Sequence, residues 1–174
     1  MKKYLLIFSV LVLFVTIACV KEPLAMYYDL GVVEVIADST NINFNVPDPD
    51  TNGWHQWESG EGTNTFTIIL KEKAKKDVVI DEVVWTFYTL DGGYVAQRSE
   101  DYIPPIKIDA GKEHELSLTV KVDEGIADDL DDATGDANDF YGEGTIEFDV
   151  RGYDVERGNE INTIPSYTPI TIQR

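Results

Sequence analysis

Apolar and polar residues alternate with a period of two along most of this 174-residue chain. Successive side chains of a β-strand point to opposite faces, so such a segment has one face for a core and one for solvent. Strands of this kind are typical of antiparallel sheets. The apolar members of the alternating segments are Ile42, Phe44 and Val46; Phe66, Ile68 and Leu70; Leu116, Leu118, Val120 and Val122; Ile146, Phe148 and Val150; and Ile170 and Ile172.

The segments between these stretches predict how the strands connect. Residues 78–90, VVIDEVVWTFYTL, are apolar on both faces, which indicates a central strand. Asp91-Gly92 follows and is favoured in a tight hairpin. Pro104-Pro105 predicts a short edge strand, because proline cannot donate a hydrogen bond to a neighbouring strand. Residues 123–134, DEGIADDLDDAT, predict a helical turn or two and no long helix.

Eight or nine short strands separated by turn signals predict an all-β sandwich or barrel. Residues 63–173 resemble an immunoglobulin-like or fibronectin-III-like module, and Trp85 lies where such folds bury an aromatic residue. The strand layout also resembles that of water-stress-type sandwich modules, a resemblance that carries no functional residues. We therefore expect residues 31–174 to form a single immunoglobulin-like antiparallel β-sandwich.

The N-terminus predicts secretion and lipid anchoring. Lys2 and Lys3 precede an apolar run without charge, the layout of a signal peptide. Thr16-Ile17-Ala18-Cys19 resembles a bacterial lipobox, with Thr16 in place of the usual leucine, and Cys19 is the only cysteine. The resemblance implies a cleaved signal over 1–18, a lipid on Cys19 and a tether over 19–30. The alternative is a buried free thiol. An acylated Cys19 would hold the protein at a membrane of the bacterial cell envelope, facing periplasm or exterior.

The charge narrows the range of partners. The formal net charge is −18, and it approaches −20 once the two lysines of the signal segment are removed. Such a surface repels phosphate groups, so a nucleic-acid partner is not expected. It favours cations or basic partners instead.

The segment DPDTNG, residues 48–53, begins like a calcium-binding loop. Side chains one residue apart converge on one ion in such loops, and glycine permits the bend. Ser59 occupies the position where a bidentate glutamate is expected, and no helix pattern flanks the segment, so it is not an EF-hand. A plain Asx-rich turn explains the same residues and is the favoured interpretation. The calcium candidates are Asp48, Asp50, Asn52 and the nearby Glu58.

An acidic run over 123–143 contains no lysine or arginine and is a second candidate for a hard cation. Runs of like charge are more often solvated loops. The candidate ligands are Asp128, Asp129, Asp131, Asp132 and Asp136.

Trp54 and Trp57 lie in a glycine-rich polar loop over 53–62. Exposed loop aromatics suit a sugar ring or a protein partner. The favoured alternative is that both rings fold back over the end of the sandwich, because large aromatic side chains are mostly buried.

Catalysis finds little support. No G-x-S-x-G, H-E-x-x-H or P-loop motif is present, and His55 and His114 are the only histidines. We therefore expect a binding or structural protein of the cell envelope and not an enzyme, without a certain cofactor. The alternatives are a carbohydrate- or small-ligand-binding accessory lipoprotein that uses loop 53–62, and an enzyme of an unidentified class.

Overall fold

The computed structural model describes residues 30–46, 61–134 and 142–173. Residues 31–174 form one compact unit. In the described residues lie nine strands, which agrees with the predicted eight or nine, and one helix. The elements are β1 (Val32–Ala37), β2 (Ile42–Asn45), β3 (Thr63–Glu72), β4 (Val78–Thr89), β5 (Tyr94–Ile108), β6 (Glu113–Lys121), α2 (Glu124–Thr134), β7 (Gly142–Asp154), β8 (Asn162–Ile164) and β9 (Ser166–Gln173).

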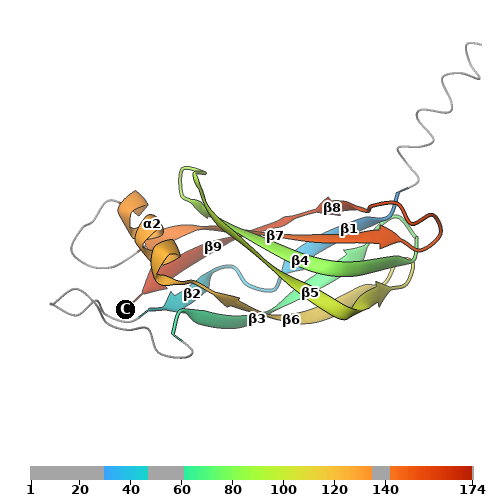
Figure 1. The fold of residues 1–174 in the computed structure, drawn as a ribbon, viewed down its shortest axis with the longest axis horizontal. Helices are drawn as coiled ribbons and strands as arrows, with labels where there is room; N and C mark the ends of the chain where they lie inside the picture. Colours follow the sequence, from blue (N-terminus) through green and yellow to red (C-terminus); the bar gives the residue numbers. More distant parts are fainter. Residues whose placement is uncertain (1–29, 47–60, 135–141, 174) are drawn as a thin grey trace, which may run out of the picture. The chain divides into compact units, whose positions relative to one another are not determined.

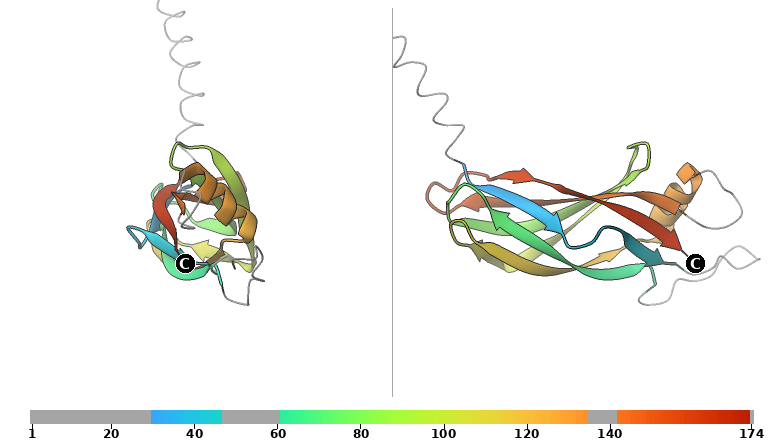
Figure 2. Two further views of the ribbon diagram at one scale, coloured as in Figure 1. Left: turned by 90° about the vertical axis from the view of Figure 1, so that its left-hand side faces the viewer. Right: turned by 180° about the vertical axis from the view of Figure 1, so that it is seen from behind.

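The strands form two sheets. One has the order β6-β3-β1-β8 and the other the order β2-β9-β7-β4-β5. Figure 1 shows the second sheet together with α2, and the view from behind in Figure 2 shows β1 and β3 of the first. The chain changes sheet at every connection between consecutive strands except that between β4 and β5. The orders β1-β3-β6 and β4-β7-β9 match the two sheets of an immunoglobulin-like sandwich, with β2 and β5 added at the two edges of the second sheet.

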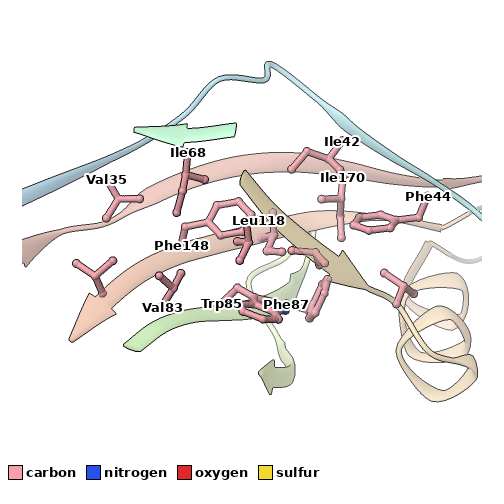
Figure 3. Packing of buried hydrophobic residues seen from close by; sticks show 14 of the residues in the cluster. Val35, Ile42, Phe44, Ile68, Val83, Trp85, Phe87, Leu118, Phe148 and Ile170 are labelled. Carbon is pink, nitrogen blue, oxygen red and sulfur yellow. The ribbon is translucent and has the colours of Figure 1, made fainter. Parts of the chain in front are cut away.

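The core lies between the sheets and is made by the apolar sides of the alternating strands. Ile68, Leu118 and Phe148 are fully buried, and the rings of Phe66 and Phe148 meet edge to face at 5.2 Å. Trp85 is 7% exposed and lies in this cluster, which confirms its predicted burial (Figure 3). The period-two pattern therefore identified the core-facing residues of most strands.

The central strand β4 contains a bulge that the alternation did not predict. β4 lies between β5 and β7, as expected from its two apolar faces. Its register shifts between Ile80 and Glu82 against both neighbours, so Val78 and Ile80 face the core before the bulge and Val83 and Trp85 after it. An extra residue in one strand reverses the side of every residue that follows. The apolar residues of β4 therefore occupy both sets of alternating positions in the sequence partly because the bulge reverses which positions face the core.

Two expectations differ from the structure in detail. β1 pairs with β8, and β2 with β9, in parallel, while the other pairings are antiparallel. Pro104-Pro105 does lie on an edge strand, but β5 has 15 residues and is not short. The prolines fall in the residues between Asp101 and Ile106 that have no partner on β4. A bulge tolerates proline because no ladder hydrogen bond is lost there, so the strand continues on both sides.

The segment after β6 forms a longer helix than the predicted turn or two. α2 has 11 residues, and the carboxylate of Asp123 accepts a hydrogen bond from the backbone N–H of Ile126 (3.1 Å), which caps its first turn. Leu130 is fully buried in the core cluster. A Cβ atom on Gly144 would lie 2.5 Å from the carbonyl oxygen of Tyr88 and 2.7 Å from Leu130, so glycine permits this close contact. The burial of its apolar side stabilises α2 where local propensity does not.

Candidate functional site

Three side chains on the solvent-facing side of the second sheet form a hydrogen-bonded cluster. The hydroxyl of Tyr88 on β4 donates to Glu147 Oε2 (2.8 Å), and the hydroxyl of Tyr167 on β9 donates to Glu147 Oε1 (2.9 Å). Glu147 lies on β7, directly opposite Tyr167 in the register. β7 runs between β4 and β9, so the two phenols approach the carboxylate from opposite sides. The sheet thus holds the carboxylate in one orientation.

The same hydrogen bonds keep the two phenols protonated. The bond to Glu147 is the main cause that raises the pKa of Tyr88 above its usual value, and burial adds to it. The bond to Glu147 also raises the pKa of Tyr167, with further contributions from burial and from Asp149. Near neutral pH both hydroxyls are therefore donors towards Glu147.

An open groove of about 360 Å³ lies beside this cluster. Its volume falls in the lower part of the range of small-molecule sites, roughly 300–1,000 Å³. We call it the tyrosine groove; it is lined by Tyr88, Thr89, Leu90, Gly92, Thr145, Glu147 and Tyr167.

The β4–β5 hairpin forms one wall of the tyrosine groove. The backbone N–H of Thr89 donates to the carbonyl of Gly93 (2.9 Å), and the N–H of Gly93 donates to the Thr89 hydroxyl (2.8 Å). Gly92 has φ +86°, a left-handed conformation that suits glycine. The Asp91-Gly92 hairpin predicted from the sequence is therefore confirmed. It holds Leu90, 63% exposed, at the edge of the groove.

The strand β7 places further negative charge on the same face. Asp149 follows Glu147 by two residues and so lies on the same side of the sheet. Neither carboxylate forms an ion pair with another described residue. Arg151, two residues further on, is paired with Glu82 at 2.9 Å. Among the residues that the structure describes, no lysine or arginine lines the tyrosine groove.

The acidic candidates of the run 123–143 lie mainly on α2. Asp128, Asp129 and Asp132 are exposed and Asp131 is partly buried, while Asp136 is outside the described residues. Burial is the main cause that raises the pKa of Asp128, and the neighbouring carboxylates, Glu124 first, add to it. Among the described ranges, no three or more histidine, cysteine or acidic side chains gather as a metal site.

The other predicted site residues fall outside the described part of the chain. These are the lipidation candidate Cys19, the calcium candidates Asp48, Asp50, Asn52 and Glu58, and the aromatic candidates Trp54 and Trp57.

Tyr88, Glu147 and Tyr167 are not recognisable as site residues in the amino-acid sequence. Glu147 is one of many polar residues on the outer face of an alternating strand, and Tyr88 is one of several aromatics in an apolar segment. In the sequence each of them is only a tyrosine or a glutamate at a solvent-facing strand position, and most sheets have such residues. Strand order, which brings the three together, could not be read from the alternation.

No protein-family model and no curated protein matches the chain. Among solved structures it is similar to PapD-like domain 7 of human CEP192, at 13% identity over 80% of this chain and 83% of that one, with a TM-score of 0.36. It is similar to the Escherichia coli chaperone DraB at 11% identity over 82% of this chain and 55% of that one, with a TM-score of 0.36. It is also similar to the sporulation control protein Spo0M of Bacillus subtilis, at 13% identity over 83% of this chain and 50% of that one, with a TM-score of 0.38.

This chain thus spans about half the length of DraB and Spo0M. Similarities at these values establish neither a family nor an activity, and the fold assignment rests on the strand topology described above. Within the residues that the structure describes, no helix has the length and apolar character needed to cross a membrane.

Proposed function

We propose that this chain is a lipid-anchored cell-envelope protein that binds its ligand through the tyrosine groove. The observation that carries the proposal is the Tyr88–Glu147–Tyr167 cluster beside an open groove. Exposed aromatic and apolar side chains that lie together and are rimmed by polar residues can mark a binding surface. Here Tyr167 is 61% exposed and Leu90 is 63% exposed, and both line the groove.

The chemistry of the groove supports binding. The hydrogen bonds to Glu147 move the pKa values of both phenols further above neutral pH. A general acid or base works best when its pKa lies near the working pH. The cluster is therefore arranged to hold a ligand group, and we do not propose an enzyme.

The position of the groove supports the anchored arrangement. Gly31 lies against Val78, at the start of β4, and the groove lies at its end, beyond Thr89. Twelve residues of strand separate these two ends, a distance of about 35 Å. A lipid on Cys19 and a tether over 19–30 would join the sandwich at the end remote from the groove. Figure 1 shows the β4–β5 hairpin and the start of β1 at opposite ends of the sheets.

Calcium stabilisation is a further part of the proposed function. Its ligands would be Asp48, Asp50, Asn52 and Glu58 in the connection between β2 and β3, and the test is given in the Discussion.

The binding surface is tested by comparing variants on an array. The array carries short peptides of different charge together with neutral and acidic oligosaccharides. The variant Tyr167→Ala removes one wall of the tyrosine groove. The control Tyr153→Ala removes a tyrosine that is 40% exposed near the other end of β7. We expect the parent and the Tyr153→Ala chain to bind the same array members, and Tyr167→Ala to lose them.

Equal signals from the Tyr167→Ala variant and the parent would place binding on another surface. Such a result with a neutral sugar would favour the alternative of an accessory lipoprotein that uses Trp54 and Trp57 in loop 53–62.

A further inference from the structure

The tyrosine groove carries negative charge that no described residue neutralises. Glu147 lines the groove, and Asp149 acts on Tyr167 closely enough to contribute to its raised pKa. A ligand that displaces water from a carboxylate must replace the lost hydration. A neutral ligand would leave this charge without a counter-ion, whereas a cation supplies one.

The walls of the groove suit an alkyl chain that carries the cation. The ring of Tyr167 is largely exposed, and the faces of aromatic rings attract cations. Leu90 offers an apolar surface on the hairpin side. A long basic side chain packs its methylene groups on apolar surface while its charged head reaches a polar partner. The groove provides both kinds of surface next to each other.

The geometry of Glu147 favours the ammonium group of lysine over the guanidinium group of arginine. Each of its oxygens already accepts one phenol hydrogen bond, from Tyr88 on Oε2 and from Tyr167 on Oε1. Guanidinium binds best as a fork across both oxygens of one carboxylate, in its plane. With one phenol bound to each oxygen, a fork needs the remaining lone pair of both oxygens at once, whereas an ammonium group acts as a compact charge and needs the remaining lone pair of only one.

We propose that the tyrosine groove binds the ammonium head of a lysine-type side chain, presented by a peptide segment of a partner protein. The inference rests on the groove being the binding surface proposed above and adds the chemical class of its ligand. The ammonium group contacts Glu147, and its alkyl chain packs between Tyr167 and Leu90. The acidic face of β7 and the net charge of −18 attract such a partner over longer distances.

The test is a titration of the full-length chain, in non-ionic detergent, with peptides of a single charge. The probe is a blocked glycine–lysine–glycine peptide, and its neutral match has norleucine in place of lysine. A third peptide carries arginine, free cadaverine tests a small molecule with the same head group, and a neutral cello-oligosaccharide tests a sugar. A single charge on each peptide limits unspecific attraction to an acidic protein; cadaverine carries two charges, so its affinity is compared between the parent and Glu147→Gln to separate the groove from that attraction.

Two variants with the same loss of charge separate the groove from the general field. Glu147→Gln removes the charge at the groove and keeps an acceptor oxygen for a phenol. Glu115→Gln removes an exposed charge on β6, in the other sheet. We expect Glu147→Gln to lower the affinity for the lysine peptide by about tenfold or more, and Glu115→Gln to change that affinity by less than about twofold. We expect the norleucine, arginine and cadaverine probes to bind more weakly than the lysine peptide, and high ionic strength to weaken the lysine peptide.

Three results would overturn the inference: equal binding of the norleucine and lysine peptides, an unchanged affinity in Glu147→Gln, or no binding of the lysine peptide at millimolar concentration. Tighter binding of cadaverine would assign the groove to a free polyamine instead of a peptide. If the sugar binds and Tyr167→Ala abolishes it, the groove remains the binding surface and only the ligand class is wrong. If Tyr167→Ala changes the binding of no probe, the proposed function itself fails.

Discussion

Trp85 shows how a single residue links the sequence pattern to the core. It stands after the bulge of β4 and faces Phe148 on β7 in the register. Its side chain is 7% exposed, and its indole nitrogen has no hydrogen-bond partner among the described residues. Figure 3 shows it among Val83, Phe87 and Leu118. Its contribution to stability is therefore that of buried apolar area.

We expect Trp85→Ala to lower the free energy of unfolding by about 3–5 kcal/mol, because it leaves a large cavity between the sheets. Trp85→Phe should cost less, because it keeps a ring and removes the unpaired N–H. Urea unfolding followed by circular dichroism measures both. The control is Tyr94→Ala, which truncates a ring that is 67% exposed on β5. An unchanged midpoint for Trp85→Ala would contradict the assignment of β4.

A second single residue, Tyr102, makes the free energy of unfolding depend on pH. Burial, with a smaller contribution from Glu100, raises the pKa of its phenol from 10.0 to about 12. Between these values the unfolded chain loses a proton that the folded chain keeps. The stabilisation is complete below about pH 10 and is lost as pH rises through about 12, because the unfolded state then binds fewer protons.

We therefore expect the free energy of unfolding to fall less steeply above pH 10 in Tyr102→Phe than in the parent. Denaturant titrations at several alkaline pH values measure the slope. Tyr94→Phe, the same change at an exposed side chain, should leave the slope of the parent unaltered. Identical slopes for Tyr102→Phe and the parent would show that this phenol is not buried.

At the scale of the element, β4 and β7 show how one strand adapts to the irregularity of another. The bulge of β4 at Asp81 adjoins the pair that Ile80 forms with Gly152 on β7. A Cβ atom on Gly152 would collide with the carbonyl oxygen of Val79, so the strand requires glycine opposite the bulge. The alternating pattern predicts which residues of both strands are apolar and buried. It does not predict the close approach of Gly152 to Val79, because that contact depends on how the two backbones pack.

The connection between β2 and β3 carries the calcium prediction. In the empty loop the carboxylates of Asp48 and Asp50 would repel each other, and an ion that relieves this repulsion binds the folded state preferentially. If the segment binds calcium rather than forming a plain Asx-rich turn, calcium raises the melting temperature, with stabilisation of about 2.7 kcal/mol at a hundredfold excess over the dissociation constant. That constant should lie at roughly 0.1–1 mM, since the loop lacks a glutamate at the twelfth position.

Scanning calorimetry with calcium, magnesium or EDTA measures this effect, and magnesium should stabilise less. The double variant Asp48→Ala, Asp50→Ala should lose the calcium shift and keep the stability seen in EDTA. The matched variant Asp128→Ala, Asp129→Ala on α2 should keep the shift. If only the α2 variant lost the calcium-dependent shift in melting temperature, the calcium site would be assigned to the acidic run 123–143. An absence of any shift in the parent would identify the segment as a plain Asx-rich turn.

At the scale of the whole molecule, the sandwich has different chemistry at its two ends. The end at which β1 begins receives the segment from Cys19, and the other end carries the tyrosine groove and α2. If Cys19 is acylated as we propose, the protein is held at one end and keeps a ligand of the tyrosine groove at the other, away from the membrane surface. The large negative charge also keeps such a domain from anionic headgroups.

The anchor is tested by the fate of Cys19. We expect the mature protein to partition into the detergent phase of a Triton X-114 extraction, because acyl chains hold it at the membrane. Cys19→Ala should be released or remain unprocessed. Mass spectrometry of the mature N-terminus should find a modified Cys19, and Cys19→Ala should leave the thermal unfolding of the sandwich unaltered. A water-soluble mature protein that begins at another residue would rule out lipid anchoring.

The sequence by itself determined the fold class, most core residues, the central place of β4 and its hairpin to β5. These features depend on local rules, because alternation separates two faces and Asp91-Gly92 suits a tight turn. The helix α2 was underestimated, because the helical signal in its own residues is weak. Its stability comes from Leu130 packing over Gly144, which lies in a different element.

Only the tertiary structure decided the candidate site. Tyr88 and Glu147 are 59 residues apart, and Glu147 and Tyr167 are 20 apart, so no short motif can contain all three. They meet because β7 pairs with β4 on one side and with β9 on the other. Alternation states which side of a strand faces solvent, but it does not state which strand lies beside it. The order of the strands follows from the packing of the whole core, and with it the position of the tyrosine groove.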